Sequence, residues 1–557
     1  MKFSYIPYTI FSLLVSFSTV AQTNKPEEKK PEASTPTKGT LTEEIEVVRP
    51  YKPVLADAAK IRRSPDLNNH KPFRPNLTYS IFDKKFELNS DIRQLEAQPL
   101  SAPPALPFLN NYAKAALGTS GTTLGELYLN NGEDEALQAG FYFKHLGQSG
   151  SLYRQKGSRQ QAGVFGKSIM DKITVNGELG FDRLASYFYA YNPDDLAFNQ
   201  DPKKQRFNTF SLKGELVKNY EQDKPLDYAA KVDAYAFSGK YGSKENSFAL
   251  SGFFNNVWKQ FNIGANTSLD FTETNDSLDI GNHIFRANPY VKFQGKNYKV
   301  SVGINFVQEF GANSRTNLLP VVIAELPIVP GYATLFGGYT GDVIKGSLRN
   351  FSYENPYLKP NLIENSIEKA NIYGGIKGNG GAGFGFKAMV YFKTISNMPL
   401  YVNYKNGAER FEIRYDTGNS NVLGLEGELN VKASDALNWT GKVEINRYDM
   451  KNEAEAWLKP GFRLHSNVRF AFNKKLKLDG EVVLNGDSQA LTFNADGTEK
   501  AITVKSYLDL SGGAEYLIKE KFGLFLRVNN LFGNKYQQLL YYPKVGFTAF
   551  GGINYSF

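Results

Sequence analysis

The residues best suited to catalysis or metal binding do not form a recognisable set in this sequence. The chain has four histidines, His70, His145, His283 and His465, and no cysteine. The histidines are far apart and lack the short spacings of a metal site or of a nucleophile with its base. They could still meet in space, but separately packed or solvated histidines are the simpler interpretation. The lack of cysteine excludes disulfides, thiolate metal ligands, cysteine nucleophiles and lipid attachment through cysteine.

Short motifs of the common enzyme classes are also missing. The sequence contains no Walker loop, no GxSxG and no HExxH. The glycine-rich run GNGGAGFGF (378–386) does not lie between a strand and a helix, so it predicts a tight turn leading into a strand. A barrel lipase or protease would need a Ser/His or Asp/His set near its rim, which four scattered histidines do not indicate. We therefore expect no enzyme, no cofactor and no metal site.

The composition favours a sheet-rich protein. Aromatic residues make up 14% of the chain, mainly as 41 Phe and 33 Tyr, and there are 50 Gly. Such a mixture suits strands better than helical bundles. The formal net charge of +9 would allow nucleic-acid binding, but Lys and Arg are interleaved with Asp and Glu and form no basic stripe along the sequence. We therefore expect no nucleic-acid partner.

The first 110 residues divide into three segments, none with an obvious globular core. Residues 1–21 have the short apolar stretch and small terminal residues of a signal peptide, and the stretch is short for the alternative, a membrane anchor. Residues 22–40, QTNKPEEKKPEASTPTKGT, predict a disordered linker. Residues 41–110 are rich in proline and predict an extended periplasmic segment with at most one or two short strands.

From Asn111 onwards the sequence predicts a succession of amphipathic strands. KLKLDGEVVL (475–484) and NVLGLEGELNVK (421–432) place aliphatic residues and glycine on one face and mostly charged residues on the other. Several of the expected strands reach about 11 residues, enough to cross a bilayer at about 45° tilt, whereas strands of soluble sandwiches are usually about five or six long.

The connections between these strands alternate in length. Tight ones lie at 170–171, 295–297 and 473–475, and long polar ones at 200–205, 340–365 and 487–500. Short turns on one side and long loops on the other are typical of outer-membrane barrels. We predict an all-β fold: a transmembrane antiparallel β-barrel of about 22 strands over residues 111–557, closed because lipid leaves no backbone group unpaired, with an extended periplasmic N-terminal segment.

The C-terminal stretch carries a resemblance to a known family. LRVNNLFGNKYQQLLYYPKVGFTAFGGINYSF (526–557) resembles the end of TonB-dependent outer-membrane receptors, with Asn530, Leu531, Phe532 and Tyr536 at the matching positions. The segments at 356–378, 388–399 and 421–432 resemble strands and an entry segment in the middle of the family's barrel. Motifs of the family match over about 350–557. Over 111–350 the resemblance is limited to the general pattern of amphipathic strands.

The resemblance also implies a role for the end of the chain. The family's last strand, a glycine followed by alternating aromatics, is recognised by the barrel assembly machinery, and Gly552, Tyr555 and Phe557 match it. An ordinary aromatic girdle at the membrane edge is the alternative, and both interpretations can hold together. The chain departs from the family before the barrel, because residues 22–110 are too few for the usual plug domain, which is either absent or reduced to 41–110.

A short stretch after the linker resembles the box by which such receptors pair with TonB. It consists of Glu43, Glu44, Ile45, Glu46, Val47 and Val48. An extended segment of this kind would add a strand to a sheet edge of TonB through its backbone hydrogen bonds. A charged segment without a special role is the alternative.

Two functions follow from these expectations. The first is TonB-dependent-receptor-like uptake or binding of a nutrient ligand in the outer membrane of a Gram-negative bacterium. Its expected partners are outer-membrane lipid, TonB, the assembly machinery and a surface lipoprotein, and the solute is unknown. The second is a plugless scaffold or accessory barrel of an outer-membrane assembly complex.

The first function requires outer loops that select the solute. The candidate loops are 192–206, 340–365, 396–420 and 487–500, with Tyr353, Tyr357, Tyr401 and Tyr404 as candidate ligand contacts. Girdle or loop packing is the commoner role of such tyrosines.

Overall fold

A computed structural model describes residues 111–557, except for 133–135, 193–200, 220–224, 296, 381–382 and 435. Its elements are β1(Tyr112–Gly118), β2(Thr123–Asn130), β3(Leu137–Ser149), β4(Lys156–Ile169), β5(Ile173–Tyr187), β6(Lys204–Lys218), β7(Leu226–Gly239), β8(Lys244–Trp258), β9(Phe261–Asn275), β10(Asp279–Gln294), β11(Lys299–Gly311), β12(Arg315–Val329), β13(Ala333–Ile344), α2(Leu348–Glu354), β14(Ser366–Asn379), β15(Phe384–Tyr404), β16(Gly407–Ser434), β17(Leu437–Asp449), β18(Phe462–Ala471), β19(Leu476–Asn485), β20(Ser488–Phe493), β21(Glu499–Val504), β22(Tyr507–Lys519), β23(Phe522–Asn529), β24(Gln537–Leu539), β25(Tyr542–Pro543) and β26(Thr548–Ser556).

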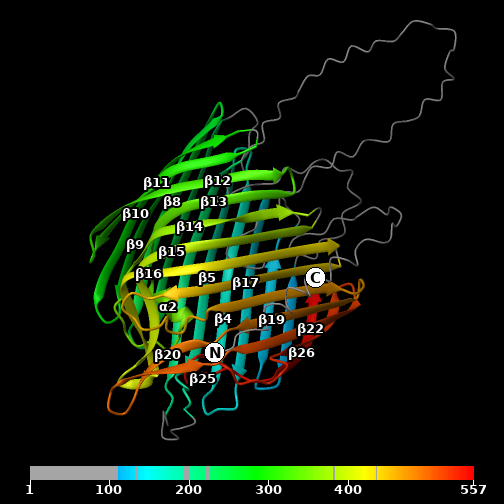
Figure 1. Cartoon of the computed structure of the whole chain (residues 1–557). Coiled ribbons are helices and arrows are strands. Elements are labelled where there is room, and N and C mark those ends of the chain that lie inside the picture. The colour runs from blue at the N-terminus through cyan, green and yellow to red at the C-terminus, as the bar shows by residue number, and fades with distance from the viewer. Residues whose placement is uncertain are drawn as a thin grey trace, which may run out of the picture. The chain divides into compact units, whose positions relative to one another are not determined.

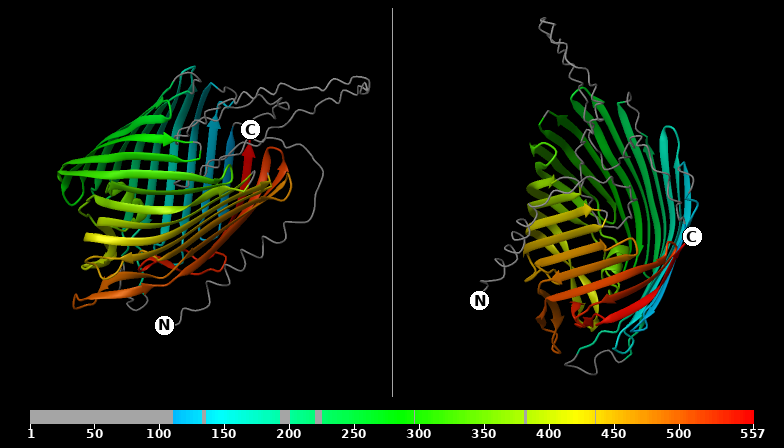
Figure 2. Two further views of the ribbon diagram at one scale, coloured as in Figure 1. Left: turned by 45° about the horizontal axis from the view of Figure 1, so that its top comes forward. Right: turned by 90° about the vertical axis from the view of Figure 1, so that its right-hand side faces the viewer.

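Twenty-two of these strands form one closed antiparallel barrel, as the sequence predicts. Each barrel strand pairs with the next along the chain, and β1 pairs with β26 to close the sheet (Figures 1 and 2). The remaining strands form two small hairpins, β20–β21 and β24–β25. Among the described residues no helix combines the length and apolarity that a membrane span requires.

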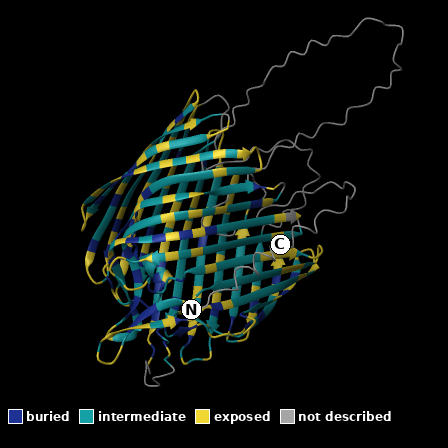
Figure 3. Ribbon diagram, viewed as in Figure 1, coloured by how far each residue is buried: buried dark blue, intermediate teal, exposed yellow. Residues whose placement is uncertain are grey.

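The two faces of the barrel wall follow the strict alternation of the strands. On β8, Phe248, Leu250 and Phe254 point outward and are exposed, whereas Glu245 and Ser247 point inward and are buried. The same alternation runs along the other strands (Figure 3). An apolar outward face on a closed antiparallel barrel is the structure that lipid requires, since all backbone groups pair within the sheet. The barrel is therefore an outer-membrane structure with a polar interior.

The connections separate the two ends of the barrel. The end that holds the start of β1 and the end of β26 has short connections, and those described throughout, such as 170–172, 259–260 and 520–521, are tight turns. The opposite end carries all the long connections, which are 188–203, 345–365, 450–461, 486–506 and 530–547. In Figure 1, α2, β20 and β25 lie at this second end. We call the first end periplasmic and the second end outer, because an even-stranded barrel keeps its termini and short turns in the periplasm.

One predicted outer loop is wrong. Residues 396–420 are not a loop, because β15 and β16 continue through them as a hairpin whose turn is at 405–406. A register shift between Ser396 and Met398 interrupts the ladder, which then resumes with Met398 opposite Asp416. Leu400, Val402 and Phe411 are fully buried in the extension. Their packing stabilises the hairpin beyond the end of the other strands. In the sequence, the polar residues around these three make the segment resemble a loop.

Candidate functional site

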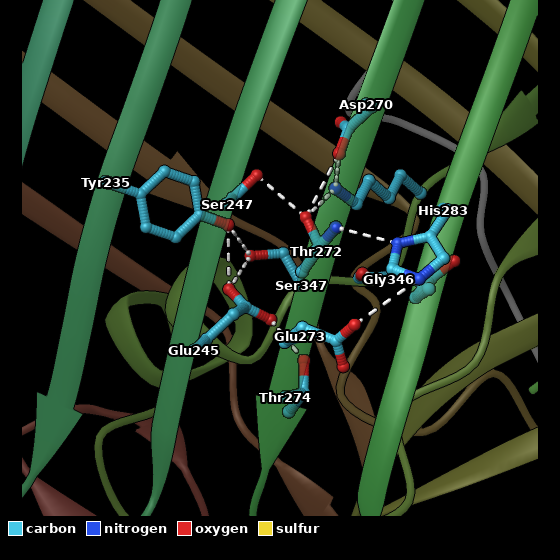
Figure 4. Close-up of polar contacts among 12 residues, drawn as sticks. Tyr235, Glu245, Ser247, Asp270, Thr272, Glu273, Thr274, His283, Gly346 and Ser347 are labelled. Atoms are coloured by element: carbon cyan, nitrogen blue, oxygen red, sulfur yellow. Dashed lines mark hydrogen bonds and ion pairs between the residues drawn. The ribbon is translucent and has the colours of Figure 1, made fainter. Parts of the chain in front are cut away.

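Glu245 lies at the centre of a polar network in the outer end of the lumen. Its carboxylate is completely buried and accepts hydrogen bonds at 2.8 Å from both the Tyr235 and the Ser347 hydroxyls (Figure 4). The backbone N–H groups of Leu348 and Arg349 donate to it at 2.7 and 3.1 Å. A buried carboxylate is tolerated only when donors surround it. These bonds fix the first turn of α2 to the wall of the barrel.

The start of the same connection, 345–365, is tied to β9. The ammonium of Lys345 forms an ion pair with Asp270 and donates to the Thr272 hydroxyl. Burial lowers the pKa of Lys345, and the Asp270 carboxylate opposes that shift. The charged pair therefore remains together in a mostly buried position.

The end of the connection is held by a second buried carboxylate. The side-chain oxygen of Asn365 accepts from the Gly346 N–H at 2.9 Å, and its amide nitrogen donates to Glu309 at 3.1 Å. Glu309 is also paired with Arg315. Residues 345–365 are thus anchored at both ends to the inner face of the strands from β8 to β12.

Aromatic side chains from several outer connections pack against one another. We call this group the outer aromatic cluster; its buried members are Phe188, Ala190, Tyr357, Leu358, Phe411 and Tyr542. The rings of Tyr357 and Tyr542 stack with centroids 3.5 Å apart, and Tyr189 packs edge-on against both. Burial raises the pKa of Tyr357 and of Tyr542 well above the ordinary value, so both hydroxyls are neutral. The cluster joins 188–203, 345–365, 530–547 and the extended hairpin.

A hollow of about 390 Å³ lies on the inner wall from β6 to β11 and reaches Asp342 of β13. Its lining includes Glu215, Lys231, Asn266, Arg286, Asn288 and Asn305. Arg286 donates to the Val343 carbonyl at 2.7 Å and pairs with Asp342 at 3.3 Å. The lining thus combines amides and charges of both signs with a larger share of apolar surface.

The four predicted loop tyrosines lie near one another but do not all face open space. Tyr357 is buried in the outer aromatic cluster. Tyr353 exchanges a hydrogen bond of 2.8 Å with Thr209, and Tyr401 donates to Glu354 at 2.8 Å. The ammonium of Lys359 lies 4.8 Å from the ring centre of Tyr404. All four thus make packing, hydrogen-bond or cation–π contacts that involve α2 or its connection.

The residues of the family motif lie at the outer end of β23. Asn530 is buried with a left-handed φ of 50°, and its amide donates to the carbonyl of Asn534 at 2.7 Å. The Tyr536 hydroxyl donates to Asp509 at 2.7 Å. Leu531 and Phe532 are more than half exposed. Asn530 and Tyr536 therefore anchor the 530–547 connection to the wall, while the two apolar residues between them remain uncovered.

The residues of the predicted assembly signal lie at the closing seam. Tyr555 and Phe557 are exposed and stack with ring centres 5.5 Å apart. Gly552 lies opposite Ala116, and a Cβ at this position would come within 1.9 Å of the Ala115 carbonyl oxygen. Only glycine permits this approach. The predicted TonB-box-like stretch, 43–48, lies outside the described residues.

The described histidines lie on different strands with separate partners. His145 contacts Thr123 and Gln160, His283 contacts Glu273, and His465 contacts Glu481. His70 lies outside the described residues. In the part of the chain that the structure describes, no group of His, Cys, Asp or Glu is arranged to hold a metal ion.

Sequence reasoning missed the anchoring residues. Glu245, Lys345 and Glu309 are charged residues near strand ends, where charge ordinarily indicates solvent exposure. Nothing in the local pattern shows that another segment covers them. The one available signal was the place of Glu245 and Glu309 on the inward face of an alternating strand, which does not distinguish an anchor from a water-lined wall. Lys345 lies in a connection and carried no such signal.

Comparisons with known proteins identify the fold. No family model and no curated protein matches the sequence. Many solved structures resemble the chain. Three of them, each matched over 80% of this chain, are the ferripyoverdine receptor of Pseudomonas aeruginosa (13% identity, 71% of that chain, TM-score 0.61), the siderophore receptor PirA of Acinetobacter baumannii (12%, 80%, 0.59) and the FrpB iron transporter of Neisseria meningitidis (11%, 81%, 0.62).

Two of these neighbours are described as receptors and one as an iron transporter. They also agree with the sequence resemblance, which was strongest from about residue 350 to the C-terminus. The chain therefore has the closed 22-stranded barrel fold of the TonB-dependent siderophore receptors.

Proposed function

We propose that this barrel takes up a ligand through the outer membrane and selects it at the outer end. The observation that carries the proposal is the anchoring of 345–365 inside the lumen of a receptor-type barrel. A connection held by buried charged contacts presents a defined surface, whereas a free loop would not. The hollow on the wall, whose lining includes charged and amide side chains, supplies donors and acceptors along the path of a solute.

Ferric chelates are the first ligand class to test. One neighbour is described as bound to ferripyoverdine, and another, Fiu of Escherichia coli, as a ferric-catecholate import receptor. A deletion strain supplied with single ferric chelates as its iron source should lose growth on at least one of them. Restoration by the intact gene, and no restoration by a gene with Glu245→Ala, would support selection at the outer end.

We further propose that TonB energises the uptake through the Glu43–Val48 stretch. Strand addition requires free backbone N–H groups, so Ile45→Pro and Val47→Pro should abolish binding to the C-terminal domain of TonB. Binding that survives both substitutions would exclude this stretch as the contact.

The scaffold function predicts a different result. A deletion strain that grows equally on every chelate, with and without TonB, but loses envelope integrity would favour a scaffold or accessory barrel. Copurification of a surface lipoprotein or of the assembly machinery with the full chain would then identify the complex.

A further inference from the structure

The outward face of two neighbouring strands, β5 and β6, changes from apolar to basic over one row of side chains. Phe181 of β5 and Phe210 of β6 lie opposite each other, with ring centres 4.8 Å apart. In the next outward row towards the outer end, Arg183 lies opposite Asn208. Arg206 follows in the row after that. The aromatic pair is therefore the upper edge of the apolar belt, and the arginines lie directly above it.

Further cations continue this surface around the barrel. The membrane-facing basic patch consists of Lys156 on β4, Arg183 on β5, Lys204 and Arg206 on β6, and Lys244 on β8. The three lysines are exposed, and the two arginines are half-buried. Among the described outward-facing residues of β4 to β8 at this level there is no Asp or Glu. Asp201, in the β5–β6 connection, pairs with Arg154 at 3.6 Å.

The two arginines lack the partners that other arginines of the wall have. On the inner face, Arg159 pairs with Asp182, and Arg315 pairs with Glu309. The side chains of Arg183 and Arg206 make no hydrogen bond or ion pair to any described residue, and the Nε of each is shielded from solvent without a partner. Because each Nε is covered by the protein, an acceptor from outside would bind the terminal amino groups of the two guanidinium groups.

Other parts of the outer rim differ. On β9 and β10, Glu273 and His283 pair at 3.4 Å. On β17, Arg447 and Asp449 point outward two residues apart, so the cation has an anion beside it. The excess of positive charge at this level is thus a property of β4 to β8.

We propose that the membrane-facing basic patch binds the phosphorylated headgroup of an outer-leaflet lipid. A headgroup phosphate lies where the hydrocarbon ends, which is the level of Arg183 and Arg206. Guanidinium groups match phosphate oxygens with paired hydrogen bonds. The patch faces sideways into the membrane rather than into the lumen or the medium, so the occupant is a lipid and not the transported solute.

The test uses the full chain purified in detergent and reconstituted with diphosphoryl lipid A or with lipid A stripped of its phosphates. Lipid retained after repeated detergent exchange is quantified by mass spectrometry. The intact protein should retain the phosphorylated form and release the stripped form. The Arg183→Gln/Arg206→Gln variant should lose at least about fivefold of this retention, as expected when two phosphate contacts are removed.

Arg447→Gln is the matched control, since it removes an outward arginine at the same end, and it should retain lipid normally. Lys156→Gln/Lys204→Gln alters only exposed side chains, so it tests the patch even if the double arginine variant does not fold; its retention should also fall. Equal retention of both lipids, unchanged retention in both patch variants, or displacement of the lipid by millimolar inorganic phosphate would overturn the proposal.

Discussion

The connections at the two ends of the barrel are held by different kinds of contact. At the periplasmic end, the turn at 259–260 connects Trp258 and Phe261, which already face each other in the ladder. At the outer end, Glu245 and Ser347 meet although they are 102 positions apart. Short turns follow from local strand pairing, whereas the outer connections depend on side chains contributed by distant segments. The outer end can therefore be altered without opening the sheet.

The largest expected effect concerns the sheet itself. Deleting residues 555–557 removes the end of the β1–β26 seam, where Ala113 lies opposite Tyr555. Because an unclosed sheet leaves unpaired backbone groups in lipid, insertion should fall strongly. Outer-membrane fractions probed by heat-modifiable mobility on gels would measure this. Unchanged levels of the truncated protein would show that neither the seam nor the predicted assembly signal needs these residues.

The next effect should be confined to the outer end. Glu245→Ala leaves the donors of Tyr235, Ser347 and α2 without their acceptor, at a cost of about 3 kcal/mol in local stability. Hydrogen exchange should increase in 345–365 and stay unchanged in the barrel strands. Glu273→Ala is the control. This exposed glutamate lies on the next strand, β9, and its one ion pair among the described residues is with His283. Uniform loss of protection throughout the barrel would contradict the separation of the two regions.

A third substitution tests the belt between the two ends. Leu250→Lys places a charge on the outward face of β8 among apolar neighbours, where lysine near the midplane costs about 2 to 3 kcal/mol. Unfolding in urea from lipid vesicles would measure the loss. Asn246→Lys, outward on the same strand but nearer the outer end, should cost much less. Equal losses for the two variants would show that the edge of the apolar belt does not lie between Leu250 and Asn246.

The smallest effect is expected at a periplasmic turn. Lys259 has a left-handed φ of 57°, which glycine adopts without the steric cost of a side chain. Lys259→Gly removes this steric cost but adds the entropic cost of glycine in the unfolded chain. The net effect should be a stabilisation of the barrel by about 0.5 kcal/mol, measured by the same unfolding experiment. Lys475→Gly, in another periplasmic turn without positive φ, should give no gain.

The faces of the strands could be read from the sequence, but their contacts could not. Most of the segment KLKLDGEVVL lies in β19, and Leu478 points outward, as the alternation predicts. The hairpin extension at 396–420 was mistaken for a loop, because its polar residues mask the buried Leu400 and Phe411. Tyr357 was predicted as a candidate ligand contact, yet its ring stacks on Tyr542, a residue 185 positions later in the chain.

The alternation of residue types and the spacing of the turns predict the barrel, its approximate strand number, its apolar exterior and the division into short and long connections. These follow from a period of two residues and from turn lengths, which are local properties of the chain. Only the tertiary structure decided which charges are buried anchors and that Lys156, Arg183, Lys204, Arg206 and Lys244 share one surface. The physical reason is the register between antiparallel strands, which brings together side chains whose spacing along the chain shows no pattern.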